Sequence, residues 1–162
     1  KDLLIPWKNV LDNAVFGLEI SGTKKDESYP RALSLMSDFK LEGIGNKFPH
    51  QLSGGMRQRV SLIRSFLLER PILLLDEPFG SLDSITREDL QDWLLGILKK
   101  FRMSSIFVTH DINEAIKISD RIIVMSSNPG KIVKEIKIAT INDEEKLSLY
   151  RKIKDSLEVL DG

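Results

Sequence analysis

A run of four aliphatic residues, Ile72 to Leu75, ends abruptly at two acids, Asp76 and Glu77. Continuous aliphatic runs are typical of strands that are buried on both faces of a helix-covered sheet. Ligands of open α/β sheets bind at the carboxyl ends of the strands. Because adjacent strand residues point to opposite sides, we expect one carboxylate to face a hydrated Mg²⁺ and the other an attacking water. The alternative is an ordinary strand followed by an acidic turn.

The rest of the chain alternates between helical and strand periodicity. Further elements are predicted as helices over residues 8–20, 30–39, 53–68, 84–101, 112–118 and 142–160, and as strands over 105–109, 121–125 and 131–138. Asn9 and Asn142 are predicted helix caps, Pro30 is predicted in a first helical turn, and residues 21–28 are predicted to be an exposed connection. Helices followed by alternating strands and helices indicate an α/β core that carries a helical subdomain.

Composition narrows the class of protein. With 162 residues the chain can bury one sizeable core. Its 24 basic and 24 acidic residues cancel, which argues against a nucleic-acid binder that works by bulk phosphate attraction. The chain has no cysteine and two histidines, so disulfides and thiolate metal sites are excluded. No apolar run approaches the roughly 18–20 residues that span a bilayer.

A second motif, Ser53-Gly54-Gly55, opens the helix predicted over residues 53–68. Serine is a favoured cap, and glycines let another group approach the backbone closely. Free amides and the positive end of the helix dipole favour an anion there, and a phosphate is the expected guest. Arg57 and Arg59 add positive charge nearby, unless they face solvent or pair with acids. The alternative is an ordinary capped helix after a loop.

His110 directly follows the strand predicted over residues 105–109. It therefore ends a strand, as Asp76 and Glu77 do, and we expect it to contact a terminal phosphate or to hold the water-activating Glu77. A lone histidine is more often structural or solvated, which is the alternative here. No role is assigned to His50.

Four strings occur in order: LSGGMRQRV at 52–60, ILLLDEP at 72–78, FGSLD at 79–83 and VTHD at 108–111. Together they resemble the signature, Walker B, D-loop and switch-histidine motifs of the ABC transporter ATP-binding subunit family. The resemblance covers nearly the whole chain. It implies a P-loop NTPase (RecA-like) core with parallel strands, here incomplete, plus the ABC α-helical subdomain and a C-terminal helix. We expect residues 1–68 to form the helical subdomain, 69–140 the α/β core and 141–162 the last helix.

The resemblance implies that two subunits sandwich two ATP molecules. It also implies that the signature residues of one subunit contact the phosphate of the ATP that the partner holds. These residues are Ser53, Gly54, Gly55 and Gln58. It places the D-loop residues Ser81, Leu82 and Asp83 at the dimer interface.

The same resemblance assigns the chemistry to three residues. Asp76 supports Mg²⁺, Glu77 is the general base for water, and His110 is the switch histidine. Positioning and charge neutralisation are the main requirements of phosphoryl transfer, so these roles agree with the chemistry.

No phosphate-binding GxxxxGK[ST] string occurs in the chain. The family's aromatic adenine platform is also absent, and its Q-loop glutamine would fall just before Lys1. We therefore expect the chain to correspond to the C-terminal two-thirds of such a subunit, to present a signature face and to be unable to hydrolyse ATP alone. We also expect one face or edge of its sheet to be exposed.

The segment LLIPWKNVLDNAVFGLE, from Leu3 to Glu19, resembles importers, in which this region meets a coupling helix of the membrane subunit. Exposed Leu4, Ile5 and Trp7 would suit such a contact in the region Leu3–Asn13; the alternative is that they join the local core. The string SSNPGKIVKEI at 126–136 resembles the nitrate, sulfonate and taurine importers. The implied partners are a second ATP-binding subunit, a permease and, indirectly, a solute-binding protein, and the implied place is the cytoplasmic face of the membrane.

Three hypotheses remain. The first is the energy-coupling ATPase subunit of a bacterial importer. The second is a soluble ABC ATPase of DNA repair or translation, although neither coiled-coil arms nor tandem cassettes are visible. The third is a non-catalytic module that only donates its signature face.

Overall fold

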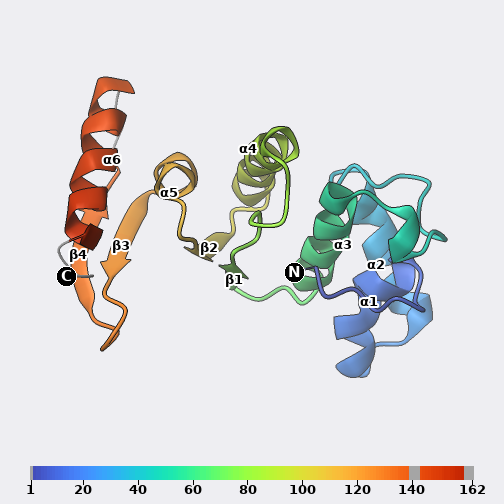
Figure 1. Cartoon of the computed structure of the whole chain (residues 1–162). Helices are drawn as coiled ribbons and strands as arrows, with labels where there is room; N and C mark the ends of the chain where they lie inside the picture. Colours follow the sequence, from blue (N-terminus) through green and yellow to red (C-terminus); the bar gives the residue numbers. More distant parts are fainter. Residues whose placement is uncertain (1, 139–142, 159–162) are drawn as a thin grey trace. The chain divides into compact units, whose positions relative to one another are not determined.

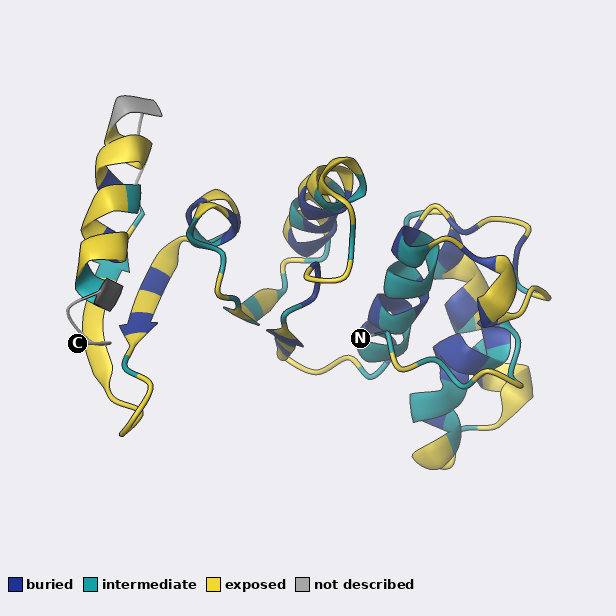
Figure 2. Ribbon diagram, viewed as in Figure 1, coloured by how far each residue is buried: buried dark blue, intermediate teal, exposed yellow. Residues whose placement is uncertain are grey.

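The computed structural model describes residues 2–138 and 143–158 of the chain, which divides into two compact units, residues 1–106 and residues 107–162. Figure 1 shows the order of the elements along the chain, and Figure 2 shows which of their residues are buried. The fold class is mixed α/β, as predicted.

Three packed helices form the first part of the first unit: α1 (Val10–Ile20), α2 (Lys25–Met36) and α3 (Gly54–Phe66). The side chain of Asn9 caps α1 by accepting a hydrogen bond from the amide of Asp12, which confirms this predicted cap. A short 3₁₀ turn, η1 (Pro49–Gln51), precedes α3. The hydrophobic core of this group includes Val15, Ala32 and Ile63, all fully buried.

The prediction for α2 was wrong at its start. α2 begins at Lys25 rather than at Pro30, and Ser28, expected in an exposed connection, is buried. Pro30 lies inside the helix, where it removes only one backbone hydrogen bond near the N-terminus. Ser28, Ala32 and Met36 are buried at a spacing of four residues, so one helical face packs into the core and offsets this loss.

The second part of the first unit contains β1 (Ile72–Asp76), α4 (Ser84–Lys100) and the start of β2 (Ser104–Val108). β1 and β2 pair in a parallel two-stranded sheet. Their ranges agree with the predicted elements to within one residue.

Burial on both faces of β1 was predicted, and this prediction was wrong. Leu73 and Leu75 are buried, but Ile72 is exposed and Leu74 is 72% exposed. The residues suit burial on two sides, yet the structure covers only the face that carries Leu73 and Leu75. The result agrees with the expectation that one face of the sheet is exposed in this chain.

An aromatic cluster ties α3 to α4. The ring of Phe39 contacts Phe66 and Trp93 edge to face, at centroid distances of 5.2 and 5.1 Å. Phe66 makes the same kind of contact with Phe101 at 5.7 Å. The guanidinium of Arg59 lies 5.0 Å from the centroid of the Trp93 ring. These contacts hold the later turns of α3 against α4.

The second unit contains the end of β2, α5 (Ile112–Ile118), β3 (Arg121–Met125), β4 (Ile132–Lys137) and α6 (Asp143–Glu158). The predicted strands β3 and β4 pair as an antiparallel hairpin, with Ile122 opposite Ile136. The core of this unit brings together Ile116, Ile122, Val124, Leu149 and Ile153. The predicted cap Asn142 and the predicted helix end at 160 lie outside the described residues.

No helix in the two described ranges is long and apolar enough to cross a membrane.

Candidate functional site

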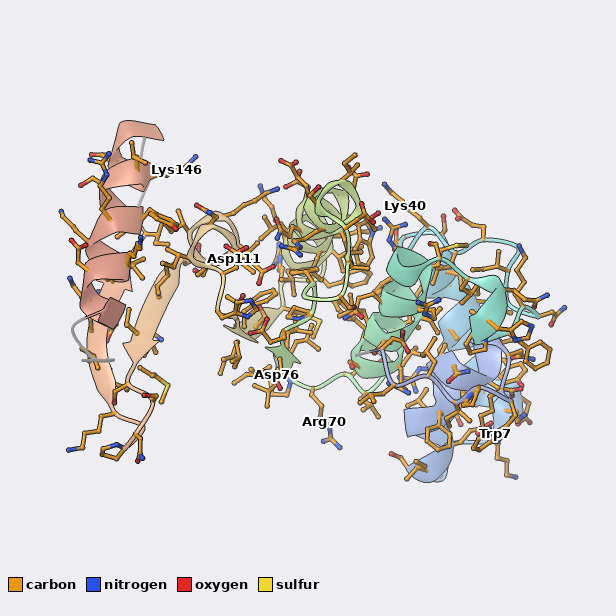
Figure 3. All side chains as sticks on the ribbon, viewed as in Figure 1. Trp7, Lys40, Arg70, Asp76, Asp111 and Lys146 are labelled. Carbon is orange, nitrogen blue, oxygen red and sulfur yellow. The ribbon has the colours of Figure 1, made fainter. Side chains whose placement is uncertain are left out.

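The two acids differ in backbone setting as well as in exposure. Asp76 is the last residue of β1 and is exposed, as labelled in Figure 3. Glu77 lies outside the strand, is half-buried and has a φ of 45°, in the left-handed region that favours glycine. The expectation that the two acids are successive strand residues was therefore wrong, because β1 ends at Asp76. The backbone reverses its conformation at Glu77, and this turn decides where the second carboxylate lies.

The loop after Glu77 is tight. The amide of Gly80 donates to the carbonyl oxygen of Glu77 at 3.4 Å, and that of Leu82 donates to Phe79 at 3.1 Å. Phe79 is fully buried and anchors the loop. A Cβ atom on Gly80 would lie 3.6 Å from Oε2 of Glu77, so the carboxylate bends over its own loop. A carboxylate held this way is suited to accept a proton from a nearby water.

The N-terminus of α3 is built as predicted. Oγ of Ser53 accepts a hydrogen bond from the amide of Met56, at 3.3 Å, and Ser53 is exposed. Within the described residues, the amides of Gly54 and Gly55 have no hydrogen-bond partner. Two free amides at the positive end of a helix form an arrangement that favours an anion. Gln58, one turn further along, is half-buried.

The nearby arginines are engaged with the protein. Nε of Arg57 donates to Asp2 at 3.1 Å, and its Nη1 donates to the carbonyl oxygen of Leu52 at 2.8 Å. Arg59 lies over Trp93, and burial lowers its pKa, although Asp89 opposes this shift. The alternative considered from the sequence, that these residues pair with protein groups, is confirmed for Arg57.

The signature glycines contact the D-loop segment within the first unit. A Cβ on Gly54 would lie 3.1 Å from Cδ2 of Leu82, and one on Gly55 would lie 3.1 Å from Cγ2 of Thr86. Larger residues at these two positions would press on the loop and on the first turn of α4. Sequence reasoning did not single out Thr86, because nothing local marks it.

Asp83 caps α4. Its carboxylate accepts a hydrogen bond from the amide of Thr86 at 3.0 Å. Hydrogen bonds from the amide and the side chain of Thr86 lower the pKa of Asp83. Ser81 is exposed and Leu82 is half-buried. Asp83 therefore has a structural task within the chain, in addition to the interface role that the resemblance implies.

His110 belongs to the second unit, two residues after the end of β2, and is exposed. The next residue, Asp111, caps α5 by accepting from the amides of Asn113 and Glu114. The structure thus brings the signature residues next to the D-loop in the first unit and places His110 at a strand end in the second.

The residues fit a hydrated Mg²⁺. Asp76 offers an exposed hard oxygen donor at the carboxyl end of β1. Among the described residues, no group of three or more His, Cys, Asp or Glu side chains gathers to hold a metal ion. One or two carboxylates suffice for Mg²⁺ when substrate phosphates supply further ligands.

The N-terminal segment exposes apolar side chains. Leu3 is exposed and Trp7 is 78% exposed, whereas Leu4 and Ile5 are half-buried. Buried Asn13 holds this segment on α1: its side chain accepts from the amide of Ile5 at 2.7 Å and donates to backbone oxygens of residues 5, 8 and 9. The expected surface is therefore present at Trp7 and smaller at Leu4 and Ile5.

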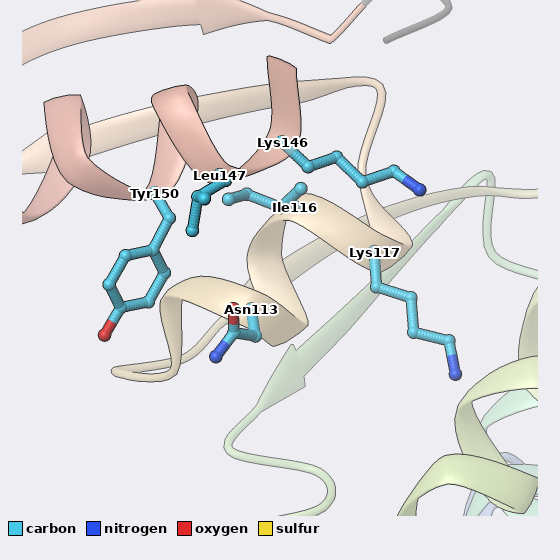
Figure 4. Close-up of a pocket in the computed structure, with 6 residues that line it drawn as sticks. All are labelled: Asn113, Ile116, Lys117, Lys146, Leu147 and Tyr150. Carbon is cyan, nitrogen blue, oxygen red and sulfur yellow. The ribbon is translucent and has the colours of Figure 1, made fainter. Parts of the chain in front are cut away.

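A separate open pocket of about 550 Å³ lies between α5 and α6 (Figure 4). Ile116 and Leu147 provide its apolar lining, and Lys117, Lys146 and Tyr150 add polar groups. None of the predicted site residues lines it.

The chain is similar to ABC transporter proteins. The family model described as ABC transporter matches residues 1–80. The chain is 46% identical over 133 residues to the taurine import ATP-binding protein TauB of Rhizobium johnstonii, an alignment that covers 82% of this chain and 51% of that protein. It is 41% identical over 153 residues to the uncharacterized ABC transporter ATP-binding protein MJ0412 of Methanocaldococcus jannaschii, covering 92% of this chain and 57% of that protein.

Among solved structures, the ATP-binding cassette MJ0796, a dimer in a post-hydrolysis state bound to ADP and Pi, is similar with a TM-score of 0.68 and 33% identity. The similarity covers 86% of this chain and 61% of that one. The chain spans about half the length of the curated relatives it matches.

Proposed function

This chain belongs to the ABC transporter ATP-binding proteins, and from this premise we propose that it is part of the energy-coupling ATPase subunit of an importer. The observation that carries the proposal is the N-terminus of α3, where Ser53 caps the helix, the amides of Gly54 and Gly55 are free, and Gly54 lies next to the D-loop residue Leu82. A phosphate group is the anion that suits such a helix end.

In the proposed reaction, the signature residues of one subunit contact the terminal phosphate of ATP bound by a second subunit. Glu77 orients the attacking water and accepts its proton, and His110 contacts the transferred phosphate. Asp76 would hold Mg²⁺, which supplies charge neutralisation when bound. These residues act mainly by positioning, as phosphoryl transfer requires.

The proposed partners follow from the surfaces of the chain. A second ATP-binding subunit would meet Ser53–Gly55 and the D-loop residues Ser81, Leu82 and Asp83. A permease would meet the region Leu3–Asn13, where Trp7 offers an exposed aromatic side chain. The subunit would then work at the cytoplasmic face of the membrane, with a solute-binding protein reached through the permease.

The transported solute is proposed from similarity. TauB of Rhizobium johnstonii is named a taurine importer subunit, and the hairpin around 126–136 resembles the nitrate, sulfonate and taurine group. We propose a small anionic or zwitterionic solute of this group. Uptake of labelled taurine, an alkanesulfonate and nitrate by cells that lack the gene would test it, and unchanged uptake of all three would contradict it.

The ATPase role is tested with the gene product purified at its natural length. Glu77→Gln should leave ATP binding intact and slow Mg²⁺-dependent hydrolysis by about 10²-fold, the usual loss for a positioned base. Glu42→Gln is the matched control, because Glu42 is an exposed carboxylate in a loop before α3. Near-normal turnover in Glu77→Gln would reject the base.

Dimer closure is tested at the cap of α3. Ser53→Arg and Ser53→Gly both remove the hydroxyl, but only arginine adds bulk and charge at the phosphate-facing end. ATP-driven dimerisation, followed by light scattering in the presence of Glu77→Gln, should be lost in Ser53→Arg and reduced far less in Ser53→Gly. Equal dimerisation of the two variants would contradict the proposed contact.

A non-catalytic, signature-donating module remains the second candidate for the 162 residues by themselves, because they contain no GxxxxGK[ST] string. Residues 1–162 alone should show no Mg²⁺-dependent ATPase activity. Hydrolysis that Glu77→Gln abolishes in this preparation would refute that expectation.

A further inference from the structure

The contact between Gly55 and Thr86 has no spare room. A Cβ on Gly55 would lie 3.1 Å from Cγ2 of Thr86, closer than an ordinary van der Waals contact. Gly55 is buried in the first turn of α3, and Thr86 lies in the first turn of α4. The two helix starts therefore meet through a glycine and a methyl group.

Thr86 is itself held in place. Its amide donates to the carboxylate of Asp83 at 3.0 Å. A β-branched side chain has few χ1 positions in a helix. The methyl group of Thr86 therefore has few other positions into which it could turn away from Gly55.

The neighbouring contact is softer. A Cβ on Gly54 would also lie 3.1 Å from its nearest neighbour, Cδ2 of Leu82, but this atom is the far end of a flexible side chain that can move aside. The later turns of α3 are held on α4 by the contact of Arg59 with Trp93. A push at Gly55 would therefore tilt the N-terminus of α3 and could not be relieved by sliding the whole helix.

We propose that Thr86 is a positioning residue for the signature motif: its methyl group is the stop that sets the N-terminus of α3 against the D-loop. Through this contact, Asp83 and Thr86 fix the direction in which the free amides of Gly54 and Gly55 point. The inference rests on the proposed function, in which these amides meet a phosphate. Any displacement of the D-loop is passed to the signature motif of the same chain.

The test is a double-mutant cycle in the gene product at its natural length. Gly55→Ala inserts a methyl against Thr86 and should lower kcat about 10-fold with a smaller change in the KM for ATP, since a displacement of a few tenths of an ångström misaligns a group that acts late in the reaction. Thr86→Ser removes the opposing methyl, keeps the hydroxyl group and the amide bond to Asp83, and should restore the Gly55→Ala enzyme to within about 3-fold of Thr86→Ser alone.

Two further variants distinguish the effect of the Thr86 methyl from that of its hydroxyl, and the contact at Gly55 from the contact at Gly54. Thr86→Val keeps the methyl and loses the hydroxyl, so it should impair turnover less than Thr86→Ser. Gly54→Ala should impair turnover less than Gly55→Ala, because Leu82 can move. Thermal unfolding of the same proteins reports the contact independently of ATP.

The outcomes are distinct. If the wild-type protein hydrolyses ATP, the proposed function stands. The positioning role is then overturned by additive losses of kcat in the double mutant, or by equal turnover of Gly54→Ala and Gly55→Ala. A wild-type protein without Mg²⁺-dependent hydrolysis would refute the proposed function and the positioning role together. In that case, a lower unfolding temperature in Gly55→Ala that Thr86→Ser corrects would still establish the contact itself.

Discussion

The left-handed backbone at Glu77 leads to a prediction about stability that is separate from catalysis. Glu77 has a φ of 45°, a region in which a Cβ atom crowds the backbone. Glu77→Ala and Glu77→Gly both lose the carboxylate and all of its contacts. They differ by one methyl group, so their difference in stability measures the conformational cost of the Cβ atom alone.

The magnitude follows from two opposing effects. The left-handed conformation costs a residue with a Cβ roughly 1–2 kcal/mol. Glycine has a more flexible unfolded chain, which costs about 0.4–1 kcal/mol. The first effect wins, so Glu77→Gly should be more stable than Glu77→Ala by roughly 0.5–1 kcal/mol. Such a difference corresponds to an unfolding temperature higher by about 1–4 °C in a domain of this size.

Glu42 supplies the control pair. It is an exposed glutamate that is not among the described residues with positive φ. Glu42→Gly should therefore be less stable than Glu42→Ala by up to about 1 kcal/mol, the opposite sign. The assay is thermal and urea unfolding of all four variants, with ATPase activity measured in parallel. If Glu77→Ala is as stable as Glu77→Gly, the backbone at Glu77 is not strained and the reasoning fails.

The remaining predictions concern residues of α1 and α4 in the first unit. Gly96, in the middle of α4, has open space where a Cβ would lie, so Gly96→Ala should stabilise the protein by about 0.5–1 kcal/mol in urea unfolding, and no gain would contradict the clearance. Asn13→Ala removes the side-chain partner of the Ile5 amide and of the Lys8 carbonyl oxygen and should cost about 1–3 kcal/mol, with faster proteolysis before α1; an unchanged protein would count against the anchoring role. Burial acts to raise the pKa of Asp12, but hydrogen bonds from Lys25 and Tyr29 outweigh it, so the pKa is lowered. The stabilisation by Asp12 is therefore full above the usual carboxyl pKa of about 3.9 and lost as pH falls through the lower folded value, and Asp12→Asn should flatten this acid limb of the unfolding midpoint.

Much of the fold could be predicted because its signals are local. The caps at Asn9 and Ser53 are short polar side chains that accept from the amide three residues later, and each lies directly before a helix. The start of α2 was missed because Pro30 is a local signal for a first turn, whereas the burial of Ser28, Ala32 and Met36 depends on contacts with other helices.

The candidate site was predicted in parts. The acids, the signature glycines and His110 follow from motifs, and the structure places each at a strand end or helix start. The turn at Glu77 was not foreseen. Nothing in the residues around Glu77 signals a positive φ, yet the backbone leaves the strand conformation there.

The sequence by itself determined the order of the elements, the caps and the family, because periodicity, capping and motif spacing are properties of neighbouring residues. The tertiary structure alone decided which glycine has room. Gly55 and Gly96 both lie in helices, yet Gly55 meets the methyl of Thr86 and Gly96 meets open space. Steric clearance depends on atoms that are distant in the chain, so no local pattern contains it.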